Sequence, residues 1–289
     1  MFSRQRAILR LVENEGGRTS RLRLVKLAFL LSREVAGPRA SIYDFVPYKR
    51  GPFSYTLYHE LQSLERDGWL SLQDEYNVEA TRLAALETAF LDTPFLDRID
   101  EISNRYRSVT TSVLIDDVYR DYPWFTLNSE LLNKRAAVRP TASPAVYTVG
   151  YQGLMVDGLL DLLIRNGIRQ LIDVRCNPIA RRYGFHKSTL AKLCGNLDIE
   201  YNHFASLGIP SAWRLDLFDR DSYDRLFGRY EKDILPRQHD SIEHVIELLT
   251  TKPSALMCME ADHLCCHRSR LASEIARRTS LPVKELRLL

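Results

Sequence analysis

Residues 254–278, SALMCMEADHLCCHRSRLASEIARR, decide the fold class that we expect for this chain. The first six residues form an apolar run typical of a buried strand, and residues 269–278 have the pattern of a helix. The run from Met257 to Arg268 joins them and holds three cysteines, two histidines, two carboxylates and an arginine. A hydrophobic core does not need this chemistry in one place. The run therefore predicts one wall of a functional site.

Strand-like and helix-like runs alternate on the N-terminal side of this stretch, throughout the second half of the chain. The expected strands are residues 146–150, 171–175 and 254–259, with further extended segments at 199–203 and 283–289. The expected helices are residues 156–166, 188–197, 222–234, 241–249 and 269–278. This alternation predicts an α/β domain with an open, mostly parallel sheet and helices on both faces.

The first half of the chain has a different pattern, in which helices come first. Apolar residues recur at helical spacing in residues 6–12, 22–35 and 53–67, and extended runs follow at 42–48 and 69–72. Helices combined with short strands around a basic turn predict a winged helix-turn-helix. The expected parts are a winged helix-turn-helix-like domain at 1–75, a helical extension and linker at 76–140, and the α/β domain at 141–289.

The composition is that of an ordinary folded protein, with 45% hydrophobic and 27% charged residues. No run approaches the roughly 20 apolar residues that span a membrane, and the N-terminus lacks the apolar core of a signal peptide. Five cysteines, two of them adjacent, make a poor disulfide framework. We therefore expect a cytoplasmic protein without membrane association. The sequence predicts no oligomeric state.

Positive charge is concentrated near the N-terminus, where residues 1–50 hold eleven Lys or Arg and four Asp or Glu. Such a segment attracts phosphates. We expect the N-terminal domain to bind nucleic acid, DNA in preference to RNA; a solvated helix face is the alternative. The residues expected to contact nucleic acid are Arg21, Arg23, Lys26, Lys49 and Arg50.

Two short motifs in the first quarter of the chain have a familiar form. They are YKRGPFS at residues 48–54 and LERDGWL at residues 64–70, at the end of the following helix. This segment resembles the Panacea or SocA-type antitoxin domain, a wing-like helical domain. A winged helix can also serve only as a protein-contact module, so a protein partner is a second expectation for this region.

Polar groups follow three of the expected strands in the second half. The first strand ends at Gly150-Tyr151, the second at Asp173-Val174-Arg175, and the third at Cys258-Met259-Glu260. Sites in parallel sheets form outside the carboxyl ends of the strands. If the second and third strands are neighbours, two acids and an arginine are expected to converge. The alternative is a buried Asp–Arg pair that ties loops together.

Several spaced motifs then occur in a fixed order. They are TVGYQG (148–153), IDVRCNP (172–178), GFHK (184–187), LGIP (207–210) with Arg214 beyond it, and CMEAD (258–262) leading to CHR (266–268). Over about residues 146–280 the chain resembles the domain-of-unknown-function 488 family, from which His186 and Ile209 depart. The resemblance implies an α/β domain whose site is formed by the Asp-x-Arg and Cys-x-Glu…Cys-His-Arg motifs. It implies no particular reaction.

Hydrolysis of a glycosidic or phosphodiester bond, at a modified or damaged base in a nucleic acid, is the first chemistry that these residues suggest. Glu260 would act as general base or position water, Asp173 would stabilise charge, and His267 would shuttle a proton. The expected substrate- and phosphate-binding residues are Gly150, Tyr151, Arg175, Arg181, Arg182, Lys187, Arg214 and Arg268.

Three other chemistries stay open. Cys266 precedes a helix and Arg268, so its thiolate could serve sulfur transfer or redox chemistry. Zinc or iron could bind Cys258, Cys266 and His267, but the spacing matches no two-pair zinc pattern, so no cofactor is predicted. The α/β domain could also be a ligand-sensing regulator or antitoxin-like protein without catalysis. The sequence lacks a Walker loop, a dinucleotide fingerprint, a nucleophile-elbow serine and an HExxH helix.

Overall fold

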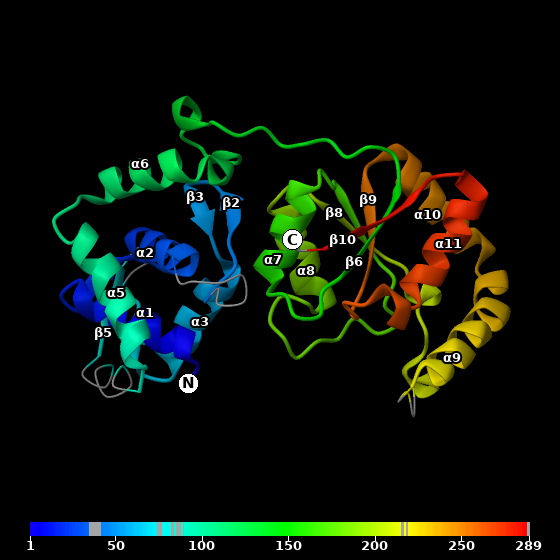
Figure 1. The fold of residues 1–289 in the computed structure, drawn as a ribbon, viewed down its shortest axis with the longest axis horizontal. Coiled ribbons are helices and arrows are strands. Elements are labelled where there is room, and N and C mark those ends of the chain that lie inside the picture. Colours follow the sequence, from blue (N-terminus) through cyan, green and yellow to red (C-terminus); the bar gives the residue numbers. More distant parts are fainter. Residues whose placement is uncertain are drawn as a thin grey trace. The chain divides into compact units, whose positions relative to one another are not determined.

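The computed structural model describes residues 1–34, 42–73, 77–81, 84, 88, 90–214, 217 and 219–287. The chain divides into two compact units, Met1–Val138 and Arg139–Leu289 (Figure 1). In the described part of the chain, no helix combines the length and apolar character needed to cross a membrane.

The N-terminal unit is built of helices around a small antiparallel sheet. Its helices are α1 (Ser3–Asn14), α2 (Arg21–Glu34), α3 (Tyr55–Arg66), α5 (Thr93–Tyr106) and α6 (Thr111–Asp121). Its strands are β1 (Arg18–Ser20), β2 (Val46–Tyr48), β3 (Gly51–Phe53), β4 (Leu70–Ser71) and β5 (Asn77–Ala80). The sheet order is β1–β5–β4, and β2 and β3 form a separate hairpin.

Local sequence explains where these helices begin and end. Ser54 caps α3 by accepting a hydrogen bond from the Leu57 N–H, and Asp92 and Thr110 cap α5 and α6 in the same way. Gly16 and Gly17, both with positive φ, follow the end of α1. Helix α2 is buried from Arg23 to Ser32, so it is the central helix of the unit.

Two expectations for this half need correction. Residues 77–80 were expected to be helical, but they form β5, which pairs with β1 and β4 and therefore completes the sheet begun before residue 75. The expected extended run at 42–48 is a strand only over Val46–Tyr48. Residue 35 of the helix expected at 22–35, and residues 76, 82–83, 85–87 and 89 in the helical extension expected at 76–140, lie outside the described residues.

The C-terminal unit is an α/β domain, as expected. Its strands are β6 (Val146–Gly150), β7 (Gln170–Asp173), β8 (Glu200–His203), β9 (Ser254–Cys258) and β10 (Val283–Leu286). Its helices are α7 (Val156–Arg165), α8 (Lys187–Gly195), α9 (Arg220–Asp233), α10 (His239–Thr251) and α11 (Arg268–Thr279). The sheet order is β10–β6–β9–β7–β8, and each of its strand pairs is parallel.

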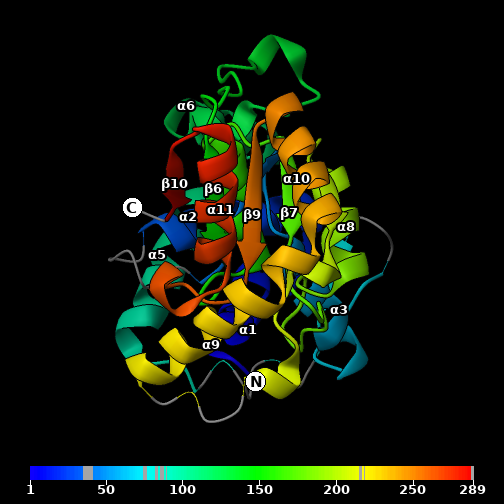
Figure 2. The same ribbon diagram turned by 90° about the vertical axis from the view of Figure 1, so that its right-hand side faces the viewer.

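Helices cover both faces of this sheet. Figure 1 shows α7 and α8 on one face and α10 and α11 on the other, and Figure 2 looks onto the α10/α11 face. Apolar residues of α9, α10 and α11 form one core with the strand residues that point to that face. Cys258 and Cys266 belong to this core, so the cysteine-rich run is folded into the unit's interior.

Candidate functional site

The carboxyl ends of three strands meet at one edge of the parallel sheet. Strand β9 lies between β6 and β7, and Gly150 pairs with Cys258 in the register. A Cβ atom on Gly150 would lie 1.9 Å from the carbonyl oxygen of Glu260. Glycine is therefore required at residue 150 for the loop after β9 to pass over the end of β6.

The register separates the predicted site residues into two groups. Asp173 pairs with Met257, and neighbouring partners in a parallel sheet point to the same face, so Cys258 points to the opposite face from Asp173. The expectation that Asp173, Arg175 and Glu260 converge is therefore wrong, although β7 and β9 are neighbours. We call the two groups the acid–arginine cluster and the thiol cluster.

The acid–arginine cluster consists of Asp173, Arg175, Tyr151 and Tyr201. Arg175 donates to both Asp173 oxygens, from Nε at 2.8 Å and from Nη2 at 2.5 Å. The Tyr201 hydroxyl donates to Asp173 at 2.6 Å, and Arg175 Nη1 donates to the Tyr151 hydroxyl at 3.1 Å. The Tyr151 ring in turn stacks on Phe185, with ring centroids 4.2 Å apart.

These contacts favour the structural alternative for the Asp–Arg motif. Asp173 is fully buried and Arg175 is 5% exposed. Burial by itself would lower the pKa of Arg175, but the hydrogen bonds and charge of Asp173 raise it. Burial, followed by the charge of Asp173, raises the pKa of Tyr201. A carboxylate held by so many donors serves to tie β7, β8 and the loop before α8 together.

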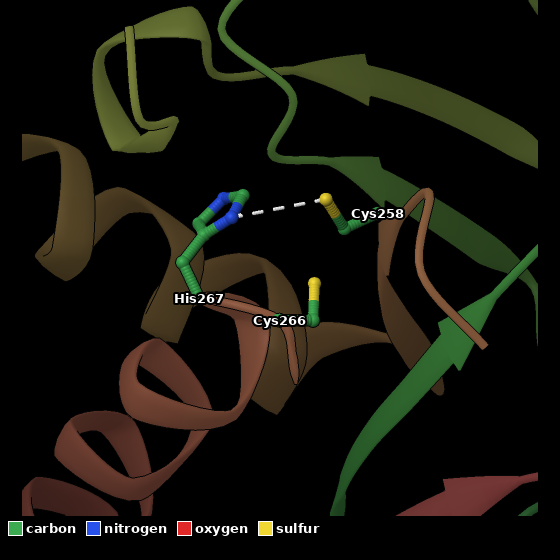
Figure 3. Close-up of side chains that lie close together, drawn as sticks. All are labelled: Cys258, Cys266 and His267. Carbon is green, nitrogen blue, oxygen red and sulfur yellow. Dashed lines mark hydrogen bonds between the residues drawn. The ribbon is translucent and has the colours of Figure 1, made fainter. Parts of the chain in front are cut away.

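The thiol cluster consists of Cys258, Cys266 and His267, with Glu260 and Arg214 beside them. Figure 3 shows the two sulfur atoms and the imidazole turned toward one another. Cys258 Sγ lies 3.8 Å from His267 Nδ1 and 3.3 Å from Glu260 Oε2. His267 Nε2 lies 3.0 Å from the carbonyl oxygen of Val174, so it carries the proton and donates. Both ring nitrogens thus face protein atoms, which disfavours a free proton shuttle.

Arg214 and Glu260 lie beside this cluster and are partly exposed to solvent. Arg214 Nη1 donates to Glu260 Oε1 at 2.9 Å, and Nη2 lies 3.4 Å from His267 Nδ1. The two side chains are 30% and 20% exposed. They border a small cavity of about 70 Å³, which is lined by Ile209, Arg214, Leu217, Tyr223, Leu226, Phe227, Glu260, Cys265 and His267.

The two buried thiols differ in their tendency to ionise. The hydrogen bond from Cys266 lowers the pKa of Cys258 well below its ordinary value; burial opposes this shift, and His267 and Arg214 add to it. Burial, with the adjacent Cys258, raises the pKa of Cys266 well above its ordinary value. These directions favour Cys258 over Cys266 as the thiol that ionises.

Arg268 does not serve as the expected phosphate clamp. Its side chain is fully buried. It donates to the carbonyl oxygens of Glu260 and Ala261 and forms an ion pair with Glu285 at 3.2 Å. Arg268 therefore holds the loop between β9 and α11 in place. Arg181, Arg182 and Lys187, in contrast, are exposed near the start of α8.

In the N-terminal unit, four of the five cations expected to contact nucleic acid line one pocket of about 460 Å³. These cations are Arg21, Lys26, Lys49 and Arg50. The aromatic side chains of Tyr48, Phe53 and Tyr58 line the same pocket. Arg23 is the exception, because it is 8% exposed, forms an ion pair with Glu15, and donates to the carbonyl oxygens of Val109 and Tyr106. The expectation that Arg23 contacts nucleic acid is therefore wrong.

Lys26 is the unusual member of this group. It is 1% exposed and donates to the carbonyl oxygen of Pro52 at 2.9 Å. Burial lowers its pKa to about 7. Lys26 thus lies at the inner wall of the pocket rather than at its rim.

Residues 155–275 match the family model described as Domain of unknown function DUF488. The resemblance stated for the C-terminal half is confirmed over that range. No curated protein and no solved structure matches the chain. The family description assigns no reaction.

Sequence reasoning missed Tyr201 and Tyr230, and it named Phe185 only as part of the GFHK motif. Tyr230 packs its ring edge-on against His267 at 5.4 Å and donates to the carbonyl oxygen of Leu207. A signal existed for Tyr201, since alternation places it on the same face as His203 within the expected strand at 199–203. Tyr230 comes from a segment without strand periodicity, and only packing brings it to the site.

Proposed function

We propose that this chain is a nucleic-acid-processing enzyme, in which the N-terminal unit binds nucleic acid and the thiol-cluster side of the C-terminal unit hydrolyses it. The observation that carries the proposal is the cavity bordered by Glu260 and Arg214 at the carboxyl end of β9. A carboxylate and a guanidinium in one partly buried recess are the groups that a hydrolytic step requires.

Glu260 is the general base in this proposal. It removes a proton from water as the oxygen attacks, and returns that proton to the leaving group. Arg214 stabilises the negative charge that develops, since its planar donors suit a phosphate or an oxyanion. An anionic substrate that binds Arg214 would release Glu260 from the 2.9 Å ion pair and leave its carboxylate available.

The cavity is small, and this limits what enters it. About 70 Å³ accommodates water and a reacting group, but not a whole base. The rest of a substrate would lie outside the cavity. Arg181, Arg182 and Lys187 are exposed cations of the same unit that can bind phosphates. In this proposal Asp173 and Arg175 have a positioning role and no contact with the reacting atoms.

Two features of the N-terminal unit support nucleic-acid binding. The pocket lined by Arg21, Lys49 and Arg50 combines cations with aromatic rings, as surfaces that hold a strand and stack its bases do. The order α1, β1, α2, α3, β4 and β5, with β5 between β1 and β4, is also compatible with a winged helix. The β2–β3 hairpin is inserted between α2 and α3.

The test is binding of the purified protein to double- and single-stranded DNA and RNA over a salt series, with the same samples examined for strand cleavage and abasic sites. We expect affinity to fall steeply with salt, and Arg50→Gln to reduce the salt slope by about one. Glu260→Gln should abolish turnover and retain binding. The matched control is Glu247→Gln, an exposed glutamate on α10. No binding at low salt, or full turnover by Glu260→Gln, would refute the proposal.

A further inference from the structure

The thiol cluster holds three donor atoms, two sulfurs and one imidazole nitrogen, and only the histidine lines the cavity. His267 reaches the cavity wall, whereas Cys258 and Cys266 are buried and lie outside its lining. Sulfur atoms that a substrate cannot reach are poorly placed as nucleophiles. They are well placed to hold something inside the protein.

We infer that Cys258, Cys266 and His267 bind a zinc ion. Their ligand atoms all lie within 4.8 Å of one another, and Cys258 Sγ is 3.8 Å from His267 Nδ1. Zinc bonds of about 2.3 Å to sulfur and about 2.1 Å to nitrogen, arranged tetrahedrally, separate such donors by roughly 3.6 Å. Small side-chain rotations therefore suffice to close the three donors around one ion.

The orientation of His267 supports this inference independently. Its Nε2–H donates to the carbonyl oxygen of Val174 at 3.0 Å, which leaves Nδ1 unprotonated and directed toward the two sulfurs. Metal-binding histidines commonly donate their second ring N–H to a carbonyl or carboxylate in this way. The adjacent positions of Cys266 and His267 in the sequence do not prevent both side chains from facing the same point.

The charge of the donor atoms favours a divalent cation, and their softness favours zinc. Two thiolates offset the charge of a divalent cation, and Glu260 and Arg214 already offset each other. Two sulfurs and an imidazole favour zinc over magnesium or calcium, which prefer oxygen. Glu260 Oε2, 3.3 Å from Cys258 Sγ, is a further oxygen donor beside the three ligands.

The test uses the whole 289-residue chain and needs no nucleic acid, so its outcome is separate from that of the proposed activity. Metal content is measured by mass spectrometry after purification without added chelator. The metal-free protein is then titrated with Co²⁺, whose bonds to thiolates give charge-transfer absorption. Zinc affinity is measured by competition with a chromophoric chelator. We expect one zinc per chain and a Co²⁺ spectrum of a site with two thiolates.

Substitutions assign the donors. Cys258→Ser, Cys266→Ser and His267→Ala should each weaken zinc binding by at least about 100-fold. The matched control is Cys265→Ser, in the same loop, whose sulfur lies 3.7 Å from Asp262 instead. It should bind zinc as the unchanged protein does. Circular dichroism of each variant shows whether it is folded.

Maleimide labelling of the unchanged protein tests zinc binding even if a variant fails to fold. Buried thiols react with a maleimide reagent only when the fold opens locally, so zinc should slow the labelling of two of the five thiols in the unchanged, denaturant-free protein, and a chelator should restore the faster rate. Mass spectrometry should locate the protected thiols at Cys258 and Cys266. Absence of thiolate–cobalt absorption, or equal zinc affinity in folded Cys258→Ser, would overturn the inference.

Discussion

At Gly150 the missing side chain decides whether the loop that carries Glu260 can close over β6. The carbonyl oxygen of Glu260 occupies the space that a Cβ would need. The loop is also held by Arg268, which donates to the carbonyl oxygens of residues 260 and 261. The position of Glu260 thus depends on a glycine more than 100 residues earlier in the chain.

Gly150→Ala should therefore displace the Glu260 loop. We expect a loss of about 1–3 kcal/mol in the free energy of unfolding, measured with urea, and loss of whatever turnover the protein shows. The control is Gly228→Ala in α9, where a Cβ meets nothing within 4 Å and alanine should stabilise the helix by up to about 1 kcal/mol. Unchanged stability in Gly150→Ala would contradict the role assigned to this glycine.

Lys26 gives the second prediction at the scale of a single residue. Its pKa is about 7 in the folded protein and 10.5 ordinarily, because burial disfavours the charged form. Between these values the unfolded chain binds a proton that the folded chain does not, so the free energy of unfolding rises with pH across this window. Below pH 7 the folded protein must hold a buried charge, and the cost is greatest there.

Lys26→Met removes this titration. We expect the variant to have a larger free energy of unfolding than the unchanged protein at pH 6. At pH 9 this advantage of the variant should be smaller by roughly 2–3 kcal/mol. Urea unfolding at both pH values measures it. Lys49→Met is the matched control, because Lys49 is exposed, and its effect should not change in this way. A pH-independent effect of Lys26→Met would show that the lysine is not buried as described.

Among the elements, strands β7 and β8 depend on the acid–arginine cluster. Asp173 at the end of β7 receives Arg175 from the same strand end and Tyr201 from β8. The sequence pattern identified the Asp173-x-Arg175 motif, but not the residues of other strands that contact it. Alternation shows only which residues of one strand share a face. Which faces coincide depends on the register between strands, and neither β7 nor β9 encodes that locally.

A double-mutant cycle tests this structural role. Asp173→Asn alone should cost about 3–5 kcal/mol of unfolding free energy, because it leaves the buried Arg175 without its counter-charge. Adding Arg175→Met should recover part of that loss, with an interaction energy of about 2–3 kcal/mol from urea unfolding of the four proteins. Additive costs would argue against the pair and reopen a catalytic role for Asp173.

At the scale of the whole molecule, the chain consists of two units that each hold their own sheet and core. The strands of the parallel sheet all come from residues 146–286, and those of the antiparallel sheet from residues 18–80. Each unit also contains its own candidate site. The chain therefore divides into two structural units, Met1–Val138 and Arg139–Leu289. In our proposal the first unit binds nucleic acid and the second hydrolyses it.

Residues 139–289, produced alone, should then fold. We expect a cooperative urea transition with a free energy of unfolding of about 5–10 kcal/mol, one equivalent of bound zinc, and a weaker, less salt-dependent affinity for nucleic acid than that of the full chain. Circular dichroism, metal analysis and a binding assay measure these three properties. A fragment that stays unfolded, or that binds nucleic acid as tightly as the full chain, would contradict the division.

The sequence by itself determined the alternation of strands and helices in the second half and the motifs at the strand ends, because periodicity and local composition are properties of neighbouring residues. It also identified the run from Met257 to Arg268, whose residues form the thiol cluster. Only the tertiary structure decided which of these groups meet. The register turned Asp173 away from Cys258, packing buried Arg23 and Arg268 against carbonyl oxygens, and the fold brought Arg214 to Glu260 across 46 residues of chain. Contacts of this kind depend on how distant segments pack, which no local pattern encodes.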